Sequence, residues 1–279
     1  MAENAAEDKK AFNRKLEAVL VEHLPACRSL LSVERLSGGA SQETYRLVVK
    51  DDTGEAGERV LAIRRAAGGV LHNKSELGYP GLSTEALLMQ SAAAAGVPEP
   101  EIHHVLTPGD GLGDGFIMAW LQGETLGARI VRSDQFEAVR PTLAYECGKF
   151  MARIHNIDLQ ATGLAEHLSS IPPREFVQQT WDRYQRFDTP QPMIDYSARW
   201  LLDHLPANHE TRLVHSDFRN GNFMLSASGI VGVLDWELAH IGDPMRDLGW
   251  ICTNSWRFGG SGPVGGFGEY GDLFRGYEE

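Results

Sequence analysis

The sequence predicts an α+β protein in two parts, the first rich in strands and the second mostly helical. Three observations lead to this prediction. Short apolar runs separated by Gly-containing turns recur up to residue 121, helical apolar spacings dominate from residue 124, and a polar loop between two apolar runs follows at 215–222. A chain of 279 residues is long enough for two modest domains, which we place at residues 1–120 and 121–279.

The composition argues against several kinds of partner. Hydrophobic residues make up 42% and charged residues 23%, as in ordinary globular proteins. The net charge of −12 argues against nucleic acid, and no apolar run is long enough for a membrane span. Three widely spaced cysteines, with no apolar signal-peptide core, indicate a reducing and hence cytoplasmic location. The oligomeric state stays open.

The N-terminal part is predicted from its apolar periodicity. An amphipathic helix with apolar positions from Phe12 to Leu24 ends before Pro25. A second helix, capped by Ser83 or Thr84, runs to residue 95. The predicted strands are residues 33–36, 46–49, 60–65, 102–106 and 116–121, with a polar turn at 51–58.

A Gly-rich turn lies between the first two strands. Gly38 and Gly39 would let backbone N–H groups approach phosphate oxygens, and Ser41 adds a hydroxyl. A plain hairpin turn also favours two glycines, and alone the turn reads that way. No Gly-Lys-Ser/Thr follows, so this is not a P-loop.

The strand at 60–65 carries a second candidate. Alternation puts Ala62 and Arg64 on one face and Leu61, Ile63 and Arg65 on the other. A small Ala beside a cation suits an adenine next to its phosphates, although both arginines could also be solvated charges at a strand end.

Glu85 lies in the first turn of the second helix. It could pair with Arg64, or it could be a favourable charge at a helix N-terminus. Both interpretations stay open.

The C-terminal part is predicted to be helical around its polar loop. Pro141 divides a long helical region at 133–154, and 238–244 and the Gly-rich 259–268 are loops, the latter flexible. His103, His104 and His155 lack metal-ligand spacing, so structural or surface roles are expected. Further helices are predicted at 174–187, 192–205, 245–256 and from 269.

The polar loop has the spacing of a kinase catalytic loop, with His215, Asp217 and Asn222 as its fixed positions. Asp217 could orient a substrate hydroxyl and accept its proton, and Arg219 could neutralise charge on the transferred phosphoryl group. Asn222 and the strand-end Asp235 could hold Mg²⁺, which prefers oxygen ligands. His215 would brace the loop. A purely structural turn would leave Asp235 unexplained.

Further stretches carry a family resemblance. Residues 61–64 have the shape of the kinase Val-Ala-Ile-Lys strand, with Arg64 in the Lys position. With the Asp-Trp-Glu of 235–237, Gly-Asp-Pro of 242–244 and Asp-Leu-Gly-Trp of 247–250, the chain resembles the aminoglycoside phosphotransferase family, within the protein-kinase-like fold. Asp-Trp-Glu in place of Asp-Phe-Gly argues against protein substrates.

The resemblance implies a two-lobe kinase-like fold, with a β-rich N-lobe containing one main helix and a mostly helical C-lobe. It also implies ATP, Mg²⁺ and a small-molecule hydroxyl acceptor. Gly38, Gly39 and Ser41 would cover the phosphates, and Arg64, held by Glu85, would contact them.

The adenine would meet Ala62 and the backbone near Met118 and Trp120. Arg64 is a planar fork where the family's Lys is a point charge, so the phosphate geometry must differ. Family members usually carry more helix beyond the point where Glu279 ends, which implies either that part of the acceptor site is missing or that the sequence is truncated.

Two acceptors and one other function stay open. The acidic charge favours an aminoglycoside-like amine sugar. Residues 63–65 are similar to a subgroup related to the kinase-like domains of acyl-CoA dehydrogenase fusions, which implies a hydroxyacyl-CoA-type acceptor. A nucleotide-binding pseudokinase that acts through protein interaction is the alternative, supported by the missing Lys and opposed by Asp217, Asn222 and Asp235 occurring together.

Overall fold

The computed structural model describes residues 2–36, 42–69 and 79–279. The chain forms two compact units. The first unit comprises Met1–Glu124 and Met224–Glu237, and the second comprises Thr125–Phe223 and Leu238–Glu279. The domain limits of 1–120 and 121–279 stay a prediction; the compact units differ from them by grouping Met224–Glu237 with the N-terminal part.

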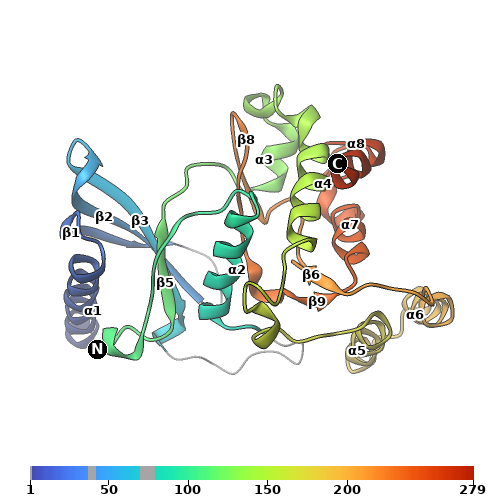
Figure 1. The fold of residues 1–279 in the computed structure, drawn as a ribbon, viewed down its shortest axis with the longest axis horizontal. Coiled ribbons are helices and arrows are strands. Elements are labelled where there is room, and N and C mark those ends of the chain that lie inside the picture. Colours follow the sequence, from blue (N-terminus) through green and yellow to red (C-terminus); the bar gives the residue numbers. More distant parts are fainter. Residues whose placement is uncertain (1, 37–41, 70–78) are drawn as a thin grey trace. The chain divides into compact units, whose positions relative to one another are not determined.

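The first unit is built on a five-stranded antiparallel sheet (Figure 1). The strand order is β1-β2-β3-β5-β4. Helix α1 packs on one face of this sheet and helix α2 lies on the other. The bounds are α1 Ala2–His23, β1 Cys27–Arg35, β2 Gln42–Glu55, β3 Glu58–Ala66, α2 Leu82–Ala94, β4 Ile102–Val105 and β5 Gly115–Ala119.

The alternation predicted for β3 is confirmed. Leu61 and Ile63 are fully buried in a core that includes Leu16 and Leu20 of α1. Arg64 lies on the opposite face, where it reaches α2. This period of two turns Leu61 and Ile63 toward the α1 side of the sheet and Arg64 toward the α2 side.

The N-terminal elements differ from the sequence-based expectation at their ends. The strand expected at 46–49 extends to Glu55, because the hairpin turn needs only Ala56 and Gly57, both with positive φ (51° and 79°). Helix α2 follows Gly81, whose φ is 84°, and has no side-chain cap. The cap expected from Ser83 or Thr84 was therefore wrong.

The second unit is mostly helical, as predicted. Helices α4, α7 and α8 contribute buried apolar residues, whereas α5 and α6 pack on each other and stay more exposed. A two-stranded sheet of β6 and β9 lies in the same unit. The bounds are α3 Gly127–Arg132, α4 Leu143–His155, α5 Pro173–Gln185, α6 Pro192–His204, β6 Arg212–Val214, β9 His240–Gly242, α7 Met245–Ile251 and α8 Tyr270–Glu278.

The structure of the second unit differs from the expectation in four places. Residues before α4 form short 3₁₀ turns and not an α-helix, because Pro141 interrupts the backbone ladder. The loop expected at 238–244 contains β9, and α7 ends at Ile251, before 256. The Gly-rich segment 259–268 forms bridged turns around buried Val264.

A β-hairpin links the compact units along the chain. It consists of β7 Phe223–Ser226 and β8 Gly229–Val233. A backbone bridge between Glu124 and Leu225 joins it to the end of the N-terminal stretch of the first unit. Asp235 follows β8 directly, so the hairpin sets its position.

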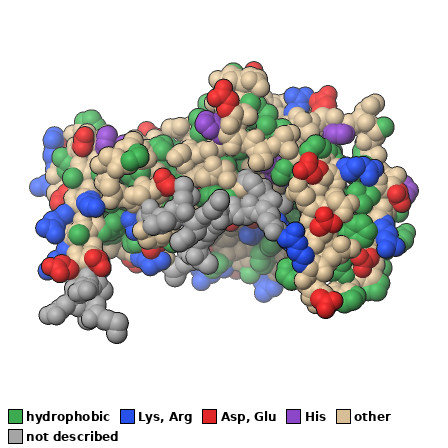
Figure 2. All heavy atoms as spheres, turned by 90° about the horizontal axis from the view of Figure 1, so that it is seen from below, with side chains coloured by type: hydrophobic (Ala, Val, Ile, Leu, Met, Phe, Trp, Pro, Cys, Tyr) green, Lys and Arg blue, Asp and Glu red, His purple; other side chains and the backbone are tan. Residues whose placement is uncertain are grey.

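The surface shows charges of both signs. On the face in Figure 2, Lys and Arg side chains are interspersed with Asp and Glu. The net charge of −12 is therefore not gathered there into one acidic field. Among the described residues, no helix combines the length and apolarity that a membrane crossing requires.

Gly276→Ala is expected to destabilise the protein by about 1–3 kcal/mol, the usual cost of overpacking. Gly276 lies on α8 where α8 crosses α4, and an added Cβ would overlap the carbonyl of Tyr145. Thermal unfolding measures the change in melting temperature.

Gly271→Ala on the same helix is the matched control. An added Cβ there meets nothing within 4 Å, so Ala should be neutral or stabilise by up to about 1 kcal/mol. Equal melting temperatures for the two variants would contradict the close helix crossing.

Candidate active site

The backbone of the polar loop between β6 and β7 is hydrogen-bonded to one buried carboxylate. Asp247 of α7 accepts the backbone N–H of His215 at 2.8 Å and that of Ser216 at 2.7 Å. Ser216 has a φ of 72°, which is strained for a residue with a side chain. His215 Nδ1 accepts the N–H of Asp217 at 3.3 Å, the bracing role expected for it. The loop is therefore fixed at both its backbone and its imidazole.

Asp247 is itself enclosed and paired. It has no exposed surface, and His155 Nε2 lies 3.1 Å from its Oδ2. Tyr277 Oη lies 2.8 Å from the other ring nitrogen of His155. Burial acts to raise the pKa of Asp247, but the bonds from His155 and the His215 N–H outweigh it and hold that pKa below its ordinary value. Asp247 is thus an anion inside the unit.

Asp217 is oriented by three side chains. Asn222 Nδ2 donates to its Oδ2 at 2.6 Å, and Trp250 Nε1 donates to its Oδ1 at 2.7 Å. Arg219 Nε contacts both oxygens, at 3.1 and 3.2 Å. The carboxylate keeps 16% of its side chain exposed, so it remains open to another group.

Two tryptophan side chains, Trp250 and Trp256, pack beside the Asp217 carboxylate and Arg219. The guanidinium of Arg219 lies 4.2 Å from the ring centre of Trp256, and Trp256 meets Trp250 edge to face at 5.3 Å. Arg246 donates to the Ser216 carbonyl at 3.3 Å, and burial lowers the pKa of Arg246 to about 10. Arg219 is thus held against Asp217; its role toward a phosphoryl group stays a prediction.

In the first unit, Arg64 pairs with two carboxylates. Its Nε lies 3.3 Å from Glu85 Oε2, and its Nη2 donates to Asp235 Oδ1 at 2.8 Å. Burial acts to lower the pKa of Arg64, but the two carboxylates outweigh it and raise that pKa above its ordinary value. The pair that the sequence left open between Arg64 and Glu85 is present.

Glu85 is supported by two residues that the sequence did not point to. Gln42 Nε2 donates to Glu85 Oε1 at 3.0 Å and to the Tyr79 hydroxyl oxygen at 2.8 Å. Burial raises the pKa of Glu85 against the opposing effect of Arg64. Neither Gln42 nor Tyr79 lies in a recognisable motif, so only the fold reveals them.

The same face of the sheet carries the other predicted nucleotide contacts. Ala62 is 3% exposed and lies opposite Met118 of β5 and Arg46 of β2. Trp120 follows β5, with Arg46 lying 5.6 Å from its ring centre. The face thus offers a small, flat, apolar surface between two cations, Arg46 and Arg64. Gly38, Gly39 and Ser41 lie outside the described residues.

A family model described as the phosphotransferase enzyme family (APH) matches residues 32–279. The chain belongs to this phosphotransferase family. Mouse acyl-CoA dehydrogenase family member 10 is 28% identical over 252 residues, which are 87% of this chain and 22% of that protein. Rat acyl-CoA dehydrogenase family member 11 is 26% identical over 249 residues, 84% of this chain and 30% of that protein. The chain thus spans less than a third of these relatives.

Solved structures confirm the expected α+β, protein-kinase-like fold class. A Ralstonia eutropha protein assigned as an aminoglycoside phosphotransferase has a TM-score of 0.73 at 23% identity, covering 95% of this chain and 79% of that one. Spectinomycin phosphotransferase APH(9)-Ia, with ADP and spectinomycin, has a TM-score of 0.59 at 15% identity, with 95% and 79% covered. APH(4)-Ia, with ADP and hygromycin B, has 0.57 at 19%, with 91% and 79% covered.

The donor chemistry in this phosphotransferase-family chain fits Mg²⁺. The side-chain amide of Asn222 donates its N–H to Asp217, so the carboxamide oxygen is the atom that can ligate a metal. Asp235 uses Oδ1 for Arg64 and keeps a second carboxylate oxygen, with 34% of its side chain exposed. Its φ of 70° is a strained value of the kind found at functional sites. Oxygen donors of this type are those that Mg²⁺ prefers.

The contacts of Trp250 and Asp247 with the polar loop are not predicted from the sequence. Both residues belong to the Asp-Leu-Gly-Trp stretch that carries the family resemblance. In the structure Trp250 donates to Asp217, and Asp247 accepts the backbone N–H of His215. They lie three apart on α7 and so share one helix face, a spacing that could have linked them to the loop.

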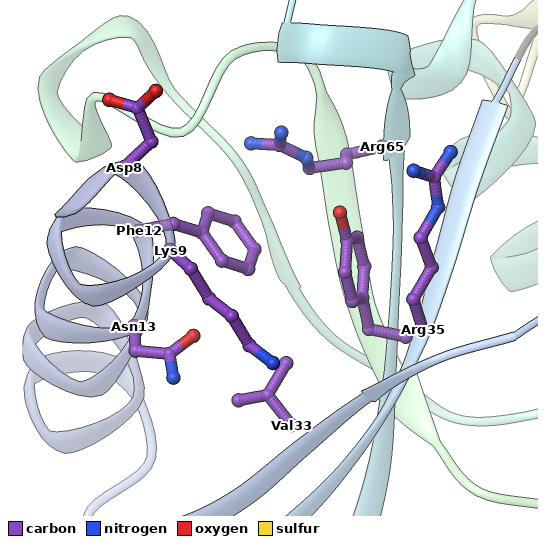
Figure 3. A pocket seen from close by; sticks show the side chains of 8 residues that line it. Asp8, Lys9, Phe12, Asn13, Val33, Arg35 and Arg65 are labelled. Atoms are coloured by element: carbon purple, nitrogen blue, oxygen red, sulfur yellow. The ribbon is translucent and has the colours of Figure 1, made fainter. Parts of the chain in front are cut away.

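A separate pocket of about 340 Å³ lies on the α1 side of the sheet (Figure 3). Phe12 of α1 and Arg35 of β1 point into it, and Tyr45 and Arg65 complete that side. Arg65 is paired there with Glu43, at 3.0 Å. Because Arg64 and Arg65 lie on opposite faces of β3, this pocket is not the predicted nucleotide face.

Glu99→Gln is expected to stabilise the protein at alkaline pH. Glu99 Oε1 accepts from Trp236 Nε1 at 3.2 Å, while its buried Oε2 has no hydrogen-bond partner within the described part of the chain. Burial raises the pKa of Glu99 well above its ordinary value, so its contribution to stability is present below the unfolded pKa and lost as pH rises toward the folded one. Gln keeps the acceptor and removes the ionisation, a gain of roughly 1–3 kcal/mol.

Urea unfolding at about pH 5 and about pH 9 measures this gain, which should appear only at the higher pH. Glu101→Gln is the matched control, since 78% of the Glu101 side chain is exposed. A Glu99→Gln gain that does not change with pH would contradict a protonated Glu99.

Proposed function

We propose that this chain transfers the γ-phosphoryl group of ATP to a hydroxyl group of a small molecule. The observation that carries the proposal is the Asp217 carboxylate, which Asn222, Trp250 and Arg219 orient while leaving it partly exposed. The acceptor oxygen attacks the γ-phosphorus, the bond to the bridging oxygen of ADP breaks, and Asp217 takes the hydroxyl proton.

The first unit supplies the nucleotide contacts in this proposal. Ala62 and Met118 receive the adenine, with Trp120 at the end of the strand, and Arg64 turns toward the phosphates while Glu85 keeps it oriented. Gly38, Gly39 and Ser41 of the predicted Gly-rich turn remain proposed phosphate contacts.

The proposed Mg²⁺ ligands are Asp235 and Asn222, the two residues predicted from the sequence. Bound Mg²⁺ neutralises phosphate charge and orients the transferred group. The free oxygen of Asp235 and the carboxamide oxygen of Asn222 suit that role. Arg219 then adds positive charge that neutralises the transferred phosphoryl group.

The proposed acceptor is a hydroxyacyl-CoA-type compound and not an aminoglycoside. Support comes from the curated relatives, which are acyl-CoA dehydrogenase family members that match this chain over 84% and 87% of its length. Because the match covers 22–30% of those proteins, they carry a segment like this chain beside other sequence.

The free state of Cys27, Cys147 and Cys252 supports the predicted reducing, cytoplasmic location.

A phosphate-transfer screen tests both levels of the proposal. The purified chain is incubated with MgATP and one acceptor class at a time, namely hydroxyacyl-CoA compounds, aminoglycosides, sugars and amino alcohols. ADP release and mass gain of the acceptor are both measured. We expect phosphorylation of a hydroxyacyl-CoA compound, and transfer to an aminoglycoside instead would overturn the acceptor only.

The pseudokinase alternative has a distinct result. Arg64 in the Lys position, already paired with Asp235, is the feature that favours it. MgATP would then raise the melting temperature without any acceptor being phosphorylated. If MgATP raises it equally in Asp235→Asn, the proposed metal role of Asp235 is wrong.

A further inference from the structure

Two imidazoles and one carboxylate of the first unit meet at the C-terminal end of α1. His23 is the last residue of α1, His104 lies in β4, and Asp110 ends the 3₁₀ turn Pro108–Asp110. His104 Nε2 lies 3.0 Å from Asp110 Oδ2, and His23 Nε2 lies 3.5 Å from Asp110 Oδ1. One ligand atom from each residue lies within 4.8 Å of the other two.

We propose that His23, His104 and Asp110 bind a divalent transition-metal ion, with Zn²⁺ as the reference case. Tetrahedral Zn²⁺ with bonds of about 2.0–2.1 Å places its ligand atoms about 3.3 Å apart. In the structure His104 lies 3.0 Å from Oδ2 and His23 lies 3.5 Å from Oδ1, so each imidazole faces a different oxygen of the Asp110 carboxylate, and one ligand atom from each residue lies within 4.8 Å of the others. Two imidazole nitrogens and one carboxylate oxygen suit Zn²⁺ and its neighbours, whereas Mg²⁺ and Ca²⁺ favour oxygen.

The carboxylate is already oriented for ligation. Thr107 donates to Asp110 Oδ2 from its backbone N–H at 2.6 Å and from its hydroxyl at 3.0 Å. Such outer hydrogen bonds fix a ligating carboxylate in known metal sites. Oδ1 is thereby turned toward His23.

The cluster is also accessible. The His23 side chain is 33% exposed, whereas that of Asp110 is 6% exposed. An ion can therefore enter from the His23 side, and water can complete its coordination. The two imidazole rings stack with centroids 3.7 Å apart, so binding one ion requires the exposed His23 ring to turn until both Nε2 lone pairs converge.

The expected role is structural. The ion would tie the end of α1 to β4 and to the turn that follows β4, which lie about 80 residues further along the chain. None of the proposed nucleotide contacts is a ligand. The sequence alone does not reveal the cluster, because His23 lies far in sequence from His104 and Asp110.

Calorimetric titration with ZnCl₂ tests the site on the full chain after chelator treatment and in excess Mg²⁺. We expect one equivalent to bind in the wild-type protein, and His23→Gln to lower the affinity at least about ten-fold. His209→Gln replaces another exposed histidine and is the matched control. Co²⁺ is the second probe, and its visible absorption should be lost only in His23→Gln.

Melting temperatures complete the test. Zn²⁺ should raise the melting temperature of wild type and His209→Gln, and should leave that of His23→Gln unchanged. Equal Zn²⁺ affinities for the two variants, or no stoichiometric binding by wild type, would overturn the proposal and leave a hydrogen-bonded His-Asp cluster. These results are independent of ATP and of any acceptor.

Discussion

Asp217→Asn is expected to lower kcat for phosphoryl transfer by roughly 10²–10⁴-fold, the usual contribution of a positioned general base. Asn cannot accept the hydroxyl proton, and it loses the charge that pairs with Arg219. Its single carboxamide oxygen can still accept from Trp250 or from Asn222, and Asp247 still holds the loop backbone, so the loop should keep its shape. Steady-state assays with the acceptor from the screen give kcat, and MgATP-dependent melting shows whether nucleotide binding survives.

Asp203→Asn is the control for this substitution, since Asp203 is an exposed residue of α6. It should leave kcat unchanged. If Asp217→Asn retained near wild-type kcat, Asp217 would not be the general base. The acceptor hydroxyl would then lose its proton to solvent.

Asp247→Ala is expected to destabilise the protein by about 3–5 kcal/mol and to abolish transfer. The substitution leaves the N–H groups of His215 and Ser216 without their acceptor, and His155 without its partner. Urea unfolding followed by Trp fluorescence measures the loss, because Trp250 and Trp256 lie beside the loop.

The effect of Asp247→Ala has a defined pH dependence. The folded pKa of Asp247 is depressed, so its contribution is present above the unfolded carboxyl pKa of about 3.9 and is lost as pH falls through the folded value. The difference in the free energy of unfolding between wild type and Asp247→Ala should therefore become smaller as the pH falls.

Asp272→Ala on α8 is the matched control, because Asp272 only pairs with Arg275 on the surface. Its expected cost is below about 1 kcal/mol. Comparable losses for Asp247→Ala and Asp272→Ala would show that Asp247 does not hold the loop.

Much of the fold could be predicted from local pattern. The period of two in residues 60–65 follows from burial on one face, and the structure confirms it. Strand ends were less predictable, because Ala56 supplies a positive φ that its residue type does not announce. The cap expected at Ser83 or Thr84 failed for a different reason, since the helix already begins after Gly81, before either residue could cap it.

Some contacts of the candidate site were likewise predictable from local sequence, and others were not. Asp217 and Asn222 share one loop, so their spacing in sequence pointed to their meeting. Trp250 and Gln42 reach the site residues across 33 and 43 positions, and only tertiary packing brings them there. Local spacing identifies the reacting groups, whereas the groups that orient them depend on the whole fold.

The buried Asp247 network has a consequence for how the protein folds. Its hydrogen bonds join positions 31, 32 and 92 residues apart, and the outermost link, from His155 to Tyr277, spans 122. Contacts between residues so far apart in sequence form only when other interactions offset the entropic cost of closing the long loop between them. We therefore expect the polar loop to order late in folding, because Asp247 must first reach it across 31 and 32 residues and His155 must reach Asp247 across 92.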